Sequence, residues 1–286
     1  MSKELILLIC ILALGFSCKN QKTQKNSSED VVRPQKSKEV STPDVLNQEL
    51  VVSAKYSAIH ILVALCDNKY QGIVPVPKAI GNGQDPRNNL YWGTAYGIKT
   101  YFKRSDEWEL VKSYSNLDVV LERLVFKHFQ KDIYLVADAY NGKYIKQTTK
   151  DFLAYSSGNK KDVIEIEEEL IGIAGHADLI GYIGHDGLMD FQLNEQYPNK
   201  DGVERDVIVL ACFSKSYFEP HLDEANVNPL VWTTGLMAPE AYTIHDALSG
   251  YINGETNQQI ATRAAQAYSK YQKCSLSAAK RLLVTN

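Results

Sequence analysis

A histidine and a cysteine each follow a short apolar run in this chain of 286 residues, and together they can carry out nucleophilic catalysis. His185 comes after the run 179–183 and Gly184, and Cys212 comes directly after the run 207–211. A cysteine thiolate is a strong nucleophile, and a neighbouring imidazole takes the thiol proton and returns it to a leaving amine. The two residues therefore predict a Cys–His dyad that attacks carbonyl carbon atoms.

The two apolar runs belong to a longer alternation of strand-like and helix-like segments. Short runs rich in Ile, Leu and Val are typical of buried parallel strands, and we expect strands at 59–65, 132–136, 179–183, 207–211 and 230–234. The pattern also predicts helices at 116–130, 146–156, 258–271 and 275–283. Such an alternation indicates an α/β domain with a mostly parallel sheet and helices on its faces.

Polar side chains follow several of the expected strands. In open parallel sheets the carboxyl ends of the strands meet at one edge, and ligands bind there. Asp67 comes after the first expected strand and Asp138 after the second, while Trp232 belongs to the fifth. We expect these three side chains to line a cleft beside His185 and Cys212.

The segment 71–97 is a long stretch rich in Gly, Asn, Asp and Pro, which are turn-forming residues. Long loops in compact domains are often functional. Arg87 and Trp92 are therefore predicted to shape a substrate pocket. Alternatively, and equally in keeping with the sequence, the segment is a surface loop that is held in place by its own turns.

At these residues the chain resembles the caspase, gingipain and separase group of cysteine peptidases and the related CHAT-type domains. The resemblance is carried by Leu-Ile-Gly-Tyr-Ile-Gly-His-Asp-Gly at 179–187 and Val-Ile-Val-Leu-Ala-Cys at 207–212, with further likeness at 61–70 and 229–239. It implies a caspase-like three-layer α/β/α sandwich without a cofactor. It also implies that Cys212 is the nucleophile and that His185 acts as base and then as acid. Gly184 and Gly187 flank the histidine and allow a tight turn, and of the nearby amides we expect those of Gly187 and Cys212 to hold the oxyanion. Asp186 separates the histidine from the glycine, which many members have side by side.

The expected function is that of an exported cysteine endopeptidase acting on protein or peptide substrates. A catalytically silent binding or signalling module with the same fold is an open alternative. An amidase or transpeptidase of the cell wall is another, because a fold does not determine a substrate. Cysteine is also one of the most buried residue types, so Cys212 could simply end a core strand.

The beginning of the chain resembles a bacterial lipoprotein signal. An apolar run at 5–14 is too short to span a bilayer and has the length of a signal-peptide core. We expect a signal peptide at 1–17, lipidation at Cys18, a polar tether at 18–48 and the α/β domain at 49–286. The protein would then be anchored to a membrane of the cell envelope. Plain secretion after ordinary cleavage is the alternative.

Composition narrows the remaining classes of function. The formal net charge of −3 does not suggest a nucleic-acid partner. Cys66, Cys212 and Cys274 are an odd number without a CxxC spacing, which argues against a disulfide framework or a structural zinc site. The other histidines lack the spacing of metal ligands, so we expect no metal. The acidic segment 165–169 is interpreted as the solvated face of a helix.

Overall fold

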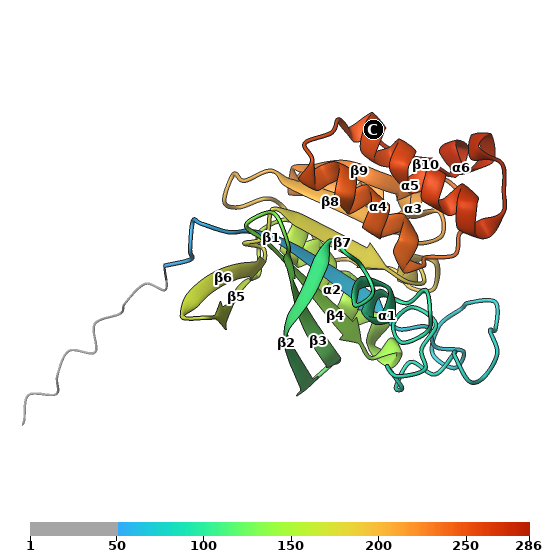
Figure 1. Cartoon of the computed structure of the whole chain (residues 1–286). Coiled ribbons are helices and arrows are strands. Elements are labelled where there is room, and N and C mark those ends of the chain that lie inside the picture. Colours follow the sequence, from blue (N-terminus) through green and yellow to red (C-terminus); the bar gives the residue numbers. More distant parts are fainter. Residues whose placement is uncertain (1–50) are drawn as a thin grey trace, which may run out of the picture. The chain divides into compact units, whose positions relative to one another are not determined.

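The computed structural model describes residues 51–286, which form a mixed α/β fold on one eight-stranded sheet (Figure 1). The expected signal peptide at 1–17, the tether at 18–48 and Cys18 lie outside the described residues. The strands are β1 (Ser57–Ala64), β2 (Trp108–Leu117), β3 (Val120–His128), β4 (Ile133–Tyr140), β5 (Lys161–Ile166), β6 (Glu169–Ala174), β7 (Leu179–Ile183), β8 (Arg205–Leu210), β9 (Val227–Thr233) and β10 (Leu283–Val284). The helices are α1 (Ile98–Phe102), α2 (Ile145–Ser156), α3 (Ser214–Leu222), α4 (Ala241–Ile252), α5 (Asn257–Gln272) and α6 (Leu276–Leu282), with short 3-10 helices η1 (Gly142–Tyr144), η2 (Gly187–Met189) and η3 (Asp223–Ala225).

The large sheet is mostly parallel, as expected. Its strands lie in the order β10-β9-β8-β7-β1-β4-β3-β2, and β5 and β6 form a separate hairpin. Strands β4, β1, β7, β8 and β9 pair in parallel, while β3, β2 and β10 add antiparallel pairs toward the edges. The carboxyl ends of the five parallel strands therefore point in one direction.

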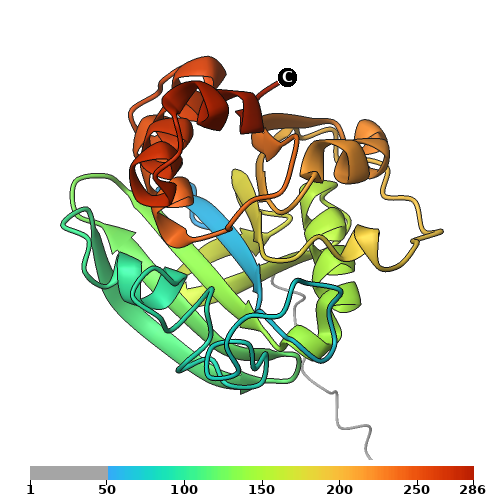
Figure 2. The same ribbon diagram turned by 90° about the vertical axis from the view of Figure 1, so that its right-hand side faces the viewer.

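Helices cover both faces of the sheet and complete a three-layer α/β/α sandwich. Alternate β1 side chains enter two different cores, because successive residues of a strand point to opposite faces. Ile59, Ile61 and Val63 join a core with α1, α4 and α5, whereas Leu62 joins one with α2 and α3. Figure 2 shows β1, in blue, between the red helices and the yellow-green α2. No helix within 51–286 has the length and apolar character needed to cross a bilayer.

Most of the expected elements are confirmed. The strands at 59–65, 179–183, 207–211 and 230–234 correspond to β1, β7, β8 and β9. The helices at 146–156, 258–271 and 275–283 correspond to α2, α5 and α6. A capping box at Thr256 begins α5, and the Ser275 side chain caps α6 by accepting the Ala278 amide hydrogen.

The prediction of a helix at 116–130 is wrong, because this segment belongs to the antiparallel hairpin of β2 and β3. Asn116 and Asp118 adopt positive φ angles of 60° and 57° at the turn. Asn and Asp tolerate this left-handed conformation better than other residues with a Cβ atom, so they can reverse the chain here. The returning strand β3 then pairs with β4, which helix formation would prevent.

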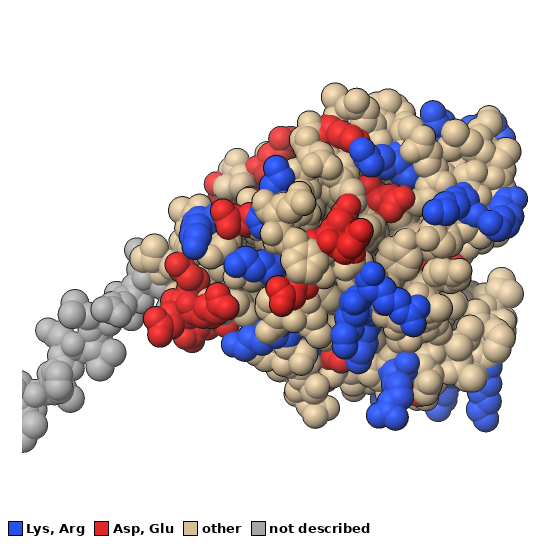
Figure 3. Space-filling model, in the orientation of Figure 1, with Lys and Arg blue, Asp and Glu red and all other residues tan. Residues whose placement is uncertain are grey.

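The acidic segment 165–169 is likewise not a helix face but the turned end of the β5–β6 hairpin. Glu167 and Glu168 adopt positive φ angles of 52° and 68° and join the two strands. Figure 3 shows acidic side chains gathered at this end of the molecule, and charges of both signs interspersed over the rest of the face. The prediction that these charges are solvated is correct, but the element that carries them is a turn.

The two edges of the large sheet have different structures. Strand β2 forms one edge and has a bulge between Leu110 and Lys112, and the side chains of Glu109, Val111 and Lys112 on this strand are exposed. At the other edge β10 has only two residues, and it pairs Leu283 with Thr233 of β9. Both edges are therefore short or interrupted.

A buried polar cluster joins four strands on the face covered by α2. Asp138 of β4 accepts hydrogen bonds from Arg123 Nε of β3 at 2.6 Å and from Arg123 Nη2 at 2.7 Å. His60 of β1 lies 3.0 Å from the same carboxylate through Nε2, and its Nδ1 accepts the amide hydrogen of Ala174 in β6 at 2.9 Å. Both His60 and Asp138 are fully buried. Burial of Asp138 is thus compensated by two partners, as a buried charge requires.

Replacing Asp138 with alanine is expected to lower the free energy of unfolding by about 3–5 kcal/mol, because it leaves the Arg123 guanidinium without its buried partner. Asp162→Ala is the matched control, since Asp162 is exposed and lies 4.0 Å from the same guanidinium. It should change the free energy by less than about 1 kcal/mol. Urea unfolding of the two variants measures the difference, and equal effects would contradict the role of the buried pair.

Candidate functional site

The parallel pairing of β7 and β8 places His185 and Cys212 at the same edge of the sheet. Ile183 and Leu210 are the last paired residues of the two strands, and each functional residue lies two positions beyond its strand's last pair. The Gly184 amide donates a hydrogen bond to the Leu210 carbonyl at 3.2 Å, which extends the pairing by one residue. His185 and Cys212 both line one cavity of about 540 Å³. The sequence-based expectation that they occupy one strand edge therefore agrees with the structure.

Gly184 is the residue that allows the chain to turn directly before the histidine. Its φ angle of +146° is one that L side chains rarely adopt. A Cβ atom at this position would lie 2.7 Å from the carbonyl oxygen of Ala64 in β1. The close approach of β1 and the turn therefore requires glycine, and the position of His185 depends on it.

His185 is held through both its ring and its backbone. Its Nε2 lies 2.8 Å from Asp190 Oδ2, and its carbonyl oxygen accepts a hydrogen bond from the Tyr182 hydroxyl at 2.8 Å. The same Asp190 oxygen accepts the Gly72 amide hydrogen at 2.8 Å, which ties the loop after β1 to the histidine. When Nε2 donates to the carboxylate, a neutral imidazole carries its lone pair on Nδ1. This arrangement leaves Nδ1 as the basic nitrogen of the ring.

Cys212 lies in a turn that hydroxyl groups fasten to β9. Phe213, the next residue, adopts a positive φ of 51° and precedes the first turn of α3. The Ser214 hydroxyl donates to the Val209 carbonyl at 2.8 Å and accepts the Thr233 amide hydrogen at 2.9 Å. Both hydroxyl side chains are fully buried, and the Thr233 hydroxyl donates to the Ala211 carbonyl. The turn is thereby bonded on both sides of Cys212.

The Cys212 thiol rests against the backbone of the segment after β9. Its Sγ atom lies 3.4 Å from the amide nitrogen of Met237, which donates to it, and 3.6 Å from the carbonyl oxygen of the same residue. Burial raises the pKa of this thiol above its ordinary value, and the Met237 amide opposes that rise. The resting group is therefore a neutral thiol, which needs a base to become a nucleophile.

A second cysteine lies near this site but is unsuited to attack. Cys66 follows β1, is completely buried, and exchanges two hydrogen bonds between its backbone and the Asn89 side chain. Burial raises the pKa of its thiol to about 11. The thiol therefore remains protonated at neutral pH.

Gly187, expected to help hold the oxyanion, is not among the residues that line the cavity, whereas Gly72 and Gly184 are. Gly187 begins η2 and is buried, and a Cβ atom there would lie 2.7 Å from the Phe191 ring. The amide of Cys212 donates no hydrogen bond to another residue within 51–286, so it remains available to an oxyanion.

The five side chains expected to line the cleft all lie elsewhere. Asp67 is buried and accepts hydrogen bonds from the Lys69 amide at 2.8 Å and from Gln84 Nε2 at 2.5 Å, so it closes its own loop. Asp138 lies inside β4, because the strand continues to Tyr140 instead of ending at 136. Arg87 borders a different surface hollow, beside Glu122.

The two tryptophans expected to line the cleft are also absent from the lining of the cavity. Trp92 is completely buried and its Nε1 donates to Glu122 at 2.6 Å. Trp232 is buried in the core on the face covered by α2 and α3, with the Lys215 ammonium over its ring. Large aromatic side chains contribute most to stability when they are buried, and both tryptophans pack inside this domain.

The cavity is instead lined by residues from three separate segments. Ile73, Val74 and Val76 come from the loop after β1, Met189 comes from η2, and the segment 236–240 follows β9. Tyr91 also contributes, and burial raises the pKa of its hydroxyl well above the ordinary value. Asp190 contacts His185 but does not line the cavity, and sequence reasoning missed it although it lies only five positions after the histidine.

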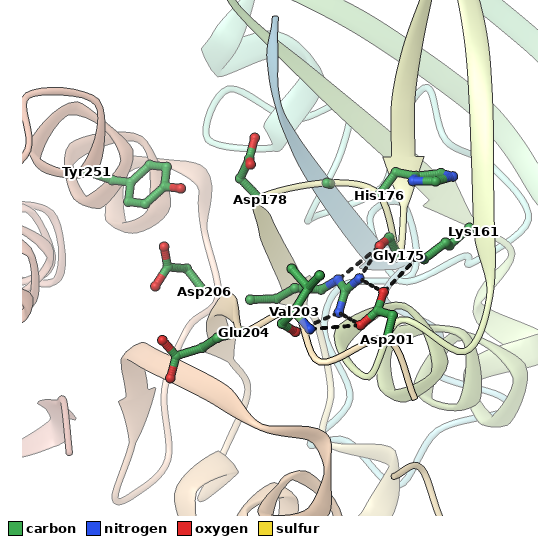
Figure 4. A pocket seen from close by; sticks show the side chains of 11 residues that line it. Lys161, Gly175, His176, Asp178, Asp201, Val203, Glu204, Asp206 and Tyr251 are labelled. Atoms are coloured by element: carbon green, nitrogen blue, oxygen red, sulfur yellow. Dashed lines mark hydrogen bonds and ion pairs between the residues drawn. The ribbon is translucent and has the colours of Figure 1, made fainter. Parts of the chain in front are cut away.

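A second hollow, of about 310 Å³, lies at the opposite edge of the sheet beside the start of β8 (Figure 4). The Arg205 guanidinium donates hydrogen bonds to Asp201 and to the Gly175 carbonyl, both of which are labelled in Figure 4. Its charge is thus already paired within the domain. Within residues 51–286 no group of three or more His, Cys, Asp or Glu side chains could hold a metal ion.

The architecture is compatible with caspase-like folds in being an α/β sandwich with a large, mostly parallel sheet. Comparison of the chain with protein-family models, with curated proteins and with solved structures finds no match. The chemistry of the site therefore rests on its own residues alone.

Asp186 follows His185 and has a buried carboxyl group of which only one oxygen atom is hydrogen-bonded. Its Oδ1 accepts the Leu188 amide hydrogen at 2.9 Å, whereas its buried Oδ2 has no partner among the described residues. Burial raises the pKa of Asp186 to about 7, and the neighbouring charge of Asp190 adds to the rise. The folded protein therefore favours the protonated form of this group.

We expect the stability of the protein to fall as the pH rises from about 4 to about 7, because the unfolded chain releases the Asp186 proton before the folded protein does. Asp186→Asn removes this dependence. The unfolding free energy of the variant relative to wild type should rise over that interval by up to about 4 kcal/mol. Urea unfolding at several pH values measures the difference, with Asp132→Asn at an exposed position as control. A pH-independent difference would contradict the raised pKa.

Proposed function

We propose that the domain is a cysteine endopeptidase in which Cys212 attacks the carbonyl carbon of a peptide bond. The observation that carries the proposal is the shared register of His185 and Cys212 beyond β7 and β8, with both side chains on one cavity. A nucleophile and its base must lie within hydrogen-bonding reach in the working state, although an unliganded site can hold them further apart. Neighbouring strands lie about 4.8 Å apart, so the two strand ends are close together, while Sγ of Cys212 contacts Met237 and Nε2 of His185 contacts Asp190.

The proposed reaction begins with proton transfer from the Cys212 thiol to Nδ1 of His185. The sulfur then forms a bond to the carbonyl carbon, and the negative charge that develops on oxygen is met by the Cys212 amide. The imidazolium returns the proton to the amine nitrogen as the C–N bond breaks, leaving an acyl-thioester. Water attacks this ester with His185 again as base, which releases the acid and restores the thiol.

Asp190 has the role of orienting the base in this proposal. Its carboxylate holds Nε2 of His185 at 2.8 Å and is itself held by the Gly72 amide. A third group of this kind fixes the tautomer of the imidazole and stabilises the imidazolium that forms during the reaction. The raised pKa of Cys212 fits a mechanism in which His185 first accepts the thiol proton, since the thiol is neutral at rest.

We further propose that the peptidase acts outside the cytoplasm on protein or peptide substrates. This part of the proposal rests on the signal-like sequence at the start of the chain and on Cys18 as the anchor. The tether 18–48 would then hold the catalytic domain away from the membrane surface.

Cys212→Ala should abolish hydrolysis of a fluorescently labelled denatured protein, and His185→Ala should reduce it by roughly 10²- to 10⁴-fold. Cys274→Ala is the matched control, because this cysteine lies away from the cavity and should leave hydrolysis unchanged. Turnover that survives in Cys212→Ala would sink the proposal. A wild-type protein without turnover, whose Cys212 reacts with iodoacetamide like an ordinary thiol, would indicate the silent binding module.

Asp190→Asn should lower kcat by roughly 10- to 100-fold with a small effect on KM, because the amide still contacts the ring but no longer stabilises its charge. Asp162→Asn serves as the control at an exposed position of β5. The measurement is steady-state hydrolysis of one peptide substrate by the three proteins. Equal kcat values for Asp190→Asn and wild type would exclude Asp190 from the mechanism.

A further inference from the structure

The cavity beside Cys212 is lined mainly by apolar side chains that have no partner to cover them. On one side the loop after β1 contributes Val74, which is 87% exposed, and on the other side the segment after β9 contributes Leu236, which is 70% exposed. Met189, at the end of η2, is 40% exposed on the same cavity. Apolar side chains that face solvent around a hollow are typical of a surface that a ligand covers.

The charged groups on this cavity are few. No Lys or Arg side chain is among the lining residues, so an acidic ligand side chain would find no counter-charge. Glu240 accepts hydrogen bonds from the Tyr242 hydroxyl at 2.8 Å and from Gln272 Nε2 at 3.0 Å, and burial raises its pKa. Both of these bonds are accepted by Oε2, so this oxygen is engaged by neighbours within the domain. Tyr91 is uncharged at neutral pH, and burial raises its pKa further.

The size of the cavity and its position next to the nucleophile define what it would hold. A volume of about 540 Å³ is within the range of cavities that bind small ligands, and it exceeds what a single aliphatic side chain needs. Cys212 and His185 lie on the same cavity as the apolar residues. A side chain bound there would belong to a residue close to the attacked carbonyl.

We propose that this cavity is the specificity pocket of the enzyme and selects a peptide by a large aliphatic or aromatic side chain next to the cleaved bond. This inference rests on the proposed peptidase function and adds the class of substrate to it. Burial of such a side chain against Val76 and Leu236 removes apolar surface from water on both partners. An acidic side chain would lose its hydration without gaining an opposite charge, and a basic one would lose its hydration in a mainly apolar lining.

The test uses a series of peptides that differ only in the residue before a coumarin leaving group, with Leu, Phe, Ala, Asp and Arg at that position. We expect kcat/KM for Leu or Phe to exceed that for Ala by roughly 10- to 200-fold, and Asp and Arg to be hydrolysed most slowly. A preference for Asp or Arg, or equal hydrolysis of all five peptides, would overturn the inference while leaving the peptidase function intact.

A variant of the pocket gives a second measurement. Val76→Asp places a charge on the cavity, and the loop should keep its fold because the Val76 amide and carbonyl both bond to the Asn68 side chain. The preference for Leu and Phe over Ala should fall by at least about 10-fold. Val111→Asp, at a partly exposed position of β2, is the matched control and should keep the preference of the wild type. An unchanged preference in Val76→Asp would argue against the pocket.

Alkylation of Cys212 separates failure of this inference from failure of the proposed function. Chloromethyl ketones of Leu and Asp react with a thiol without requiring peptide hydrolysis. Faster labelling by the Leu reagent, in a protein that hydrolyses no peptide, would support the apolar pocket and refute the peptidase. Equal labelling rates in such a protein would refute both.

Discussion

The parallel pairing of β7 with β8 is the interaction on which the site depends. Its register ends at Ile183 and Leu210, so the residues two positions further along each strand leave the sheet side by side. Everything else around the dyad preserves this relation. Gly184 lets the first strand turn against β1, and the hydroxyls of Ser214 and Thr233 hold the turn after the second. A slip of the pairing by one residue would reverse the face of every side chain on a strand, which the two cores prevent.

Two buried aspartates show how one side chain acquires opposite properties in this fold. Asp138 and Asp186 are both completely buried. Although burial alone would raise it, the pKa of Asp138 is lowered by His60 and Arg123, so this group is a charged structural link between strands. Asp186 lacks such partners, and burial raises its pKa to about 7. The first aspartate stabilises the sheet, whereas the second places a carboxyl of raised pKa next to His185.

Much of the central sheet could be predicted from the sequence, because buried parallel strands are short, apolar and β-branched. The strand-end positions of His185 and Cys212 followed from the same pattern. The β2–β3 hairpin could not be predicted in this way, since it depends on left-handed turn residues and on pairing with β4. Asp138 was misplaced because strand propensity disfavours aspartate, while the partners that retain it come from distant positions.

The residues that line the cavity could not be predicted from the sequence, for a related reason. Val76, Met189 and Leu236 are far apart along the chain and come together only in the folded domain. Asp190 is close to His185 in sequence, yet its contact depends on the turn of η2 and on the Gly72 amide from another loop. Residues at the ends of strands can thus be inferred from the local sequence pattern, whereas residues that line a pocket depend on tertiary contacts.

The two edges of the sheet have a consequence for the behaviour of the protein in solution. An edge strand with a long run of unpaired backbone groups is a template for pairing with another chain. Here one edge is interrupted by the bulge at Leu110 and carries Glu109 and Lys112 toward solvent, and the other ends in the two residues of β10. Neither edge presents a regular ladder to a second molecule. Strand addition at the edges of the large sheet is therefore hindered, even though this sheet is wide and its core strongly apolar.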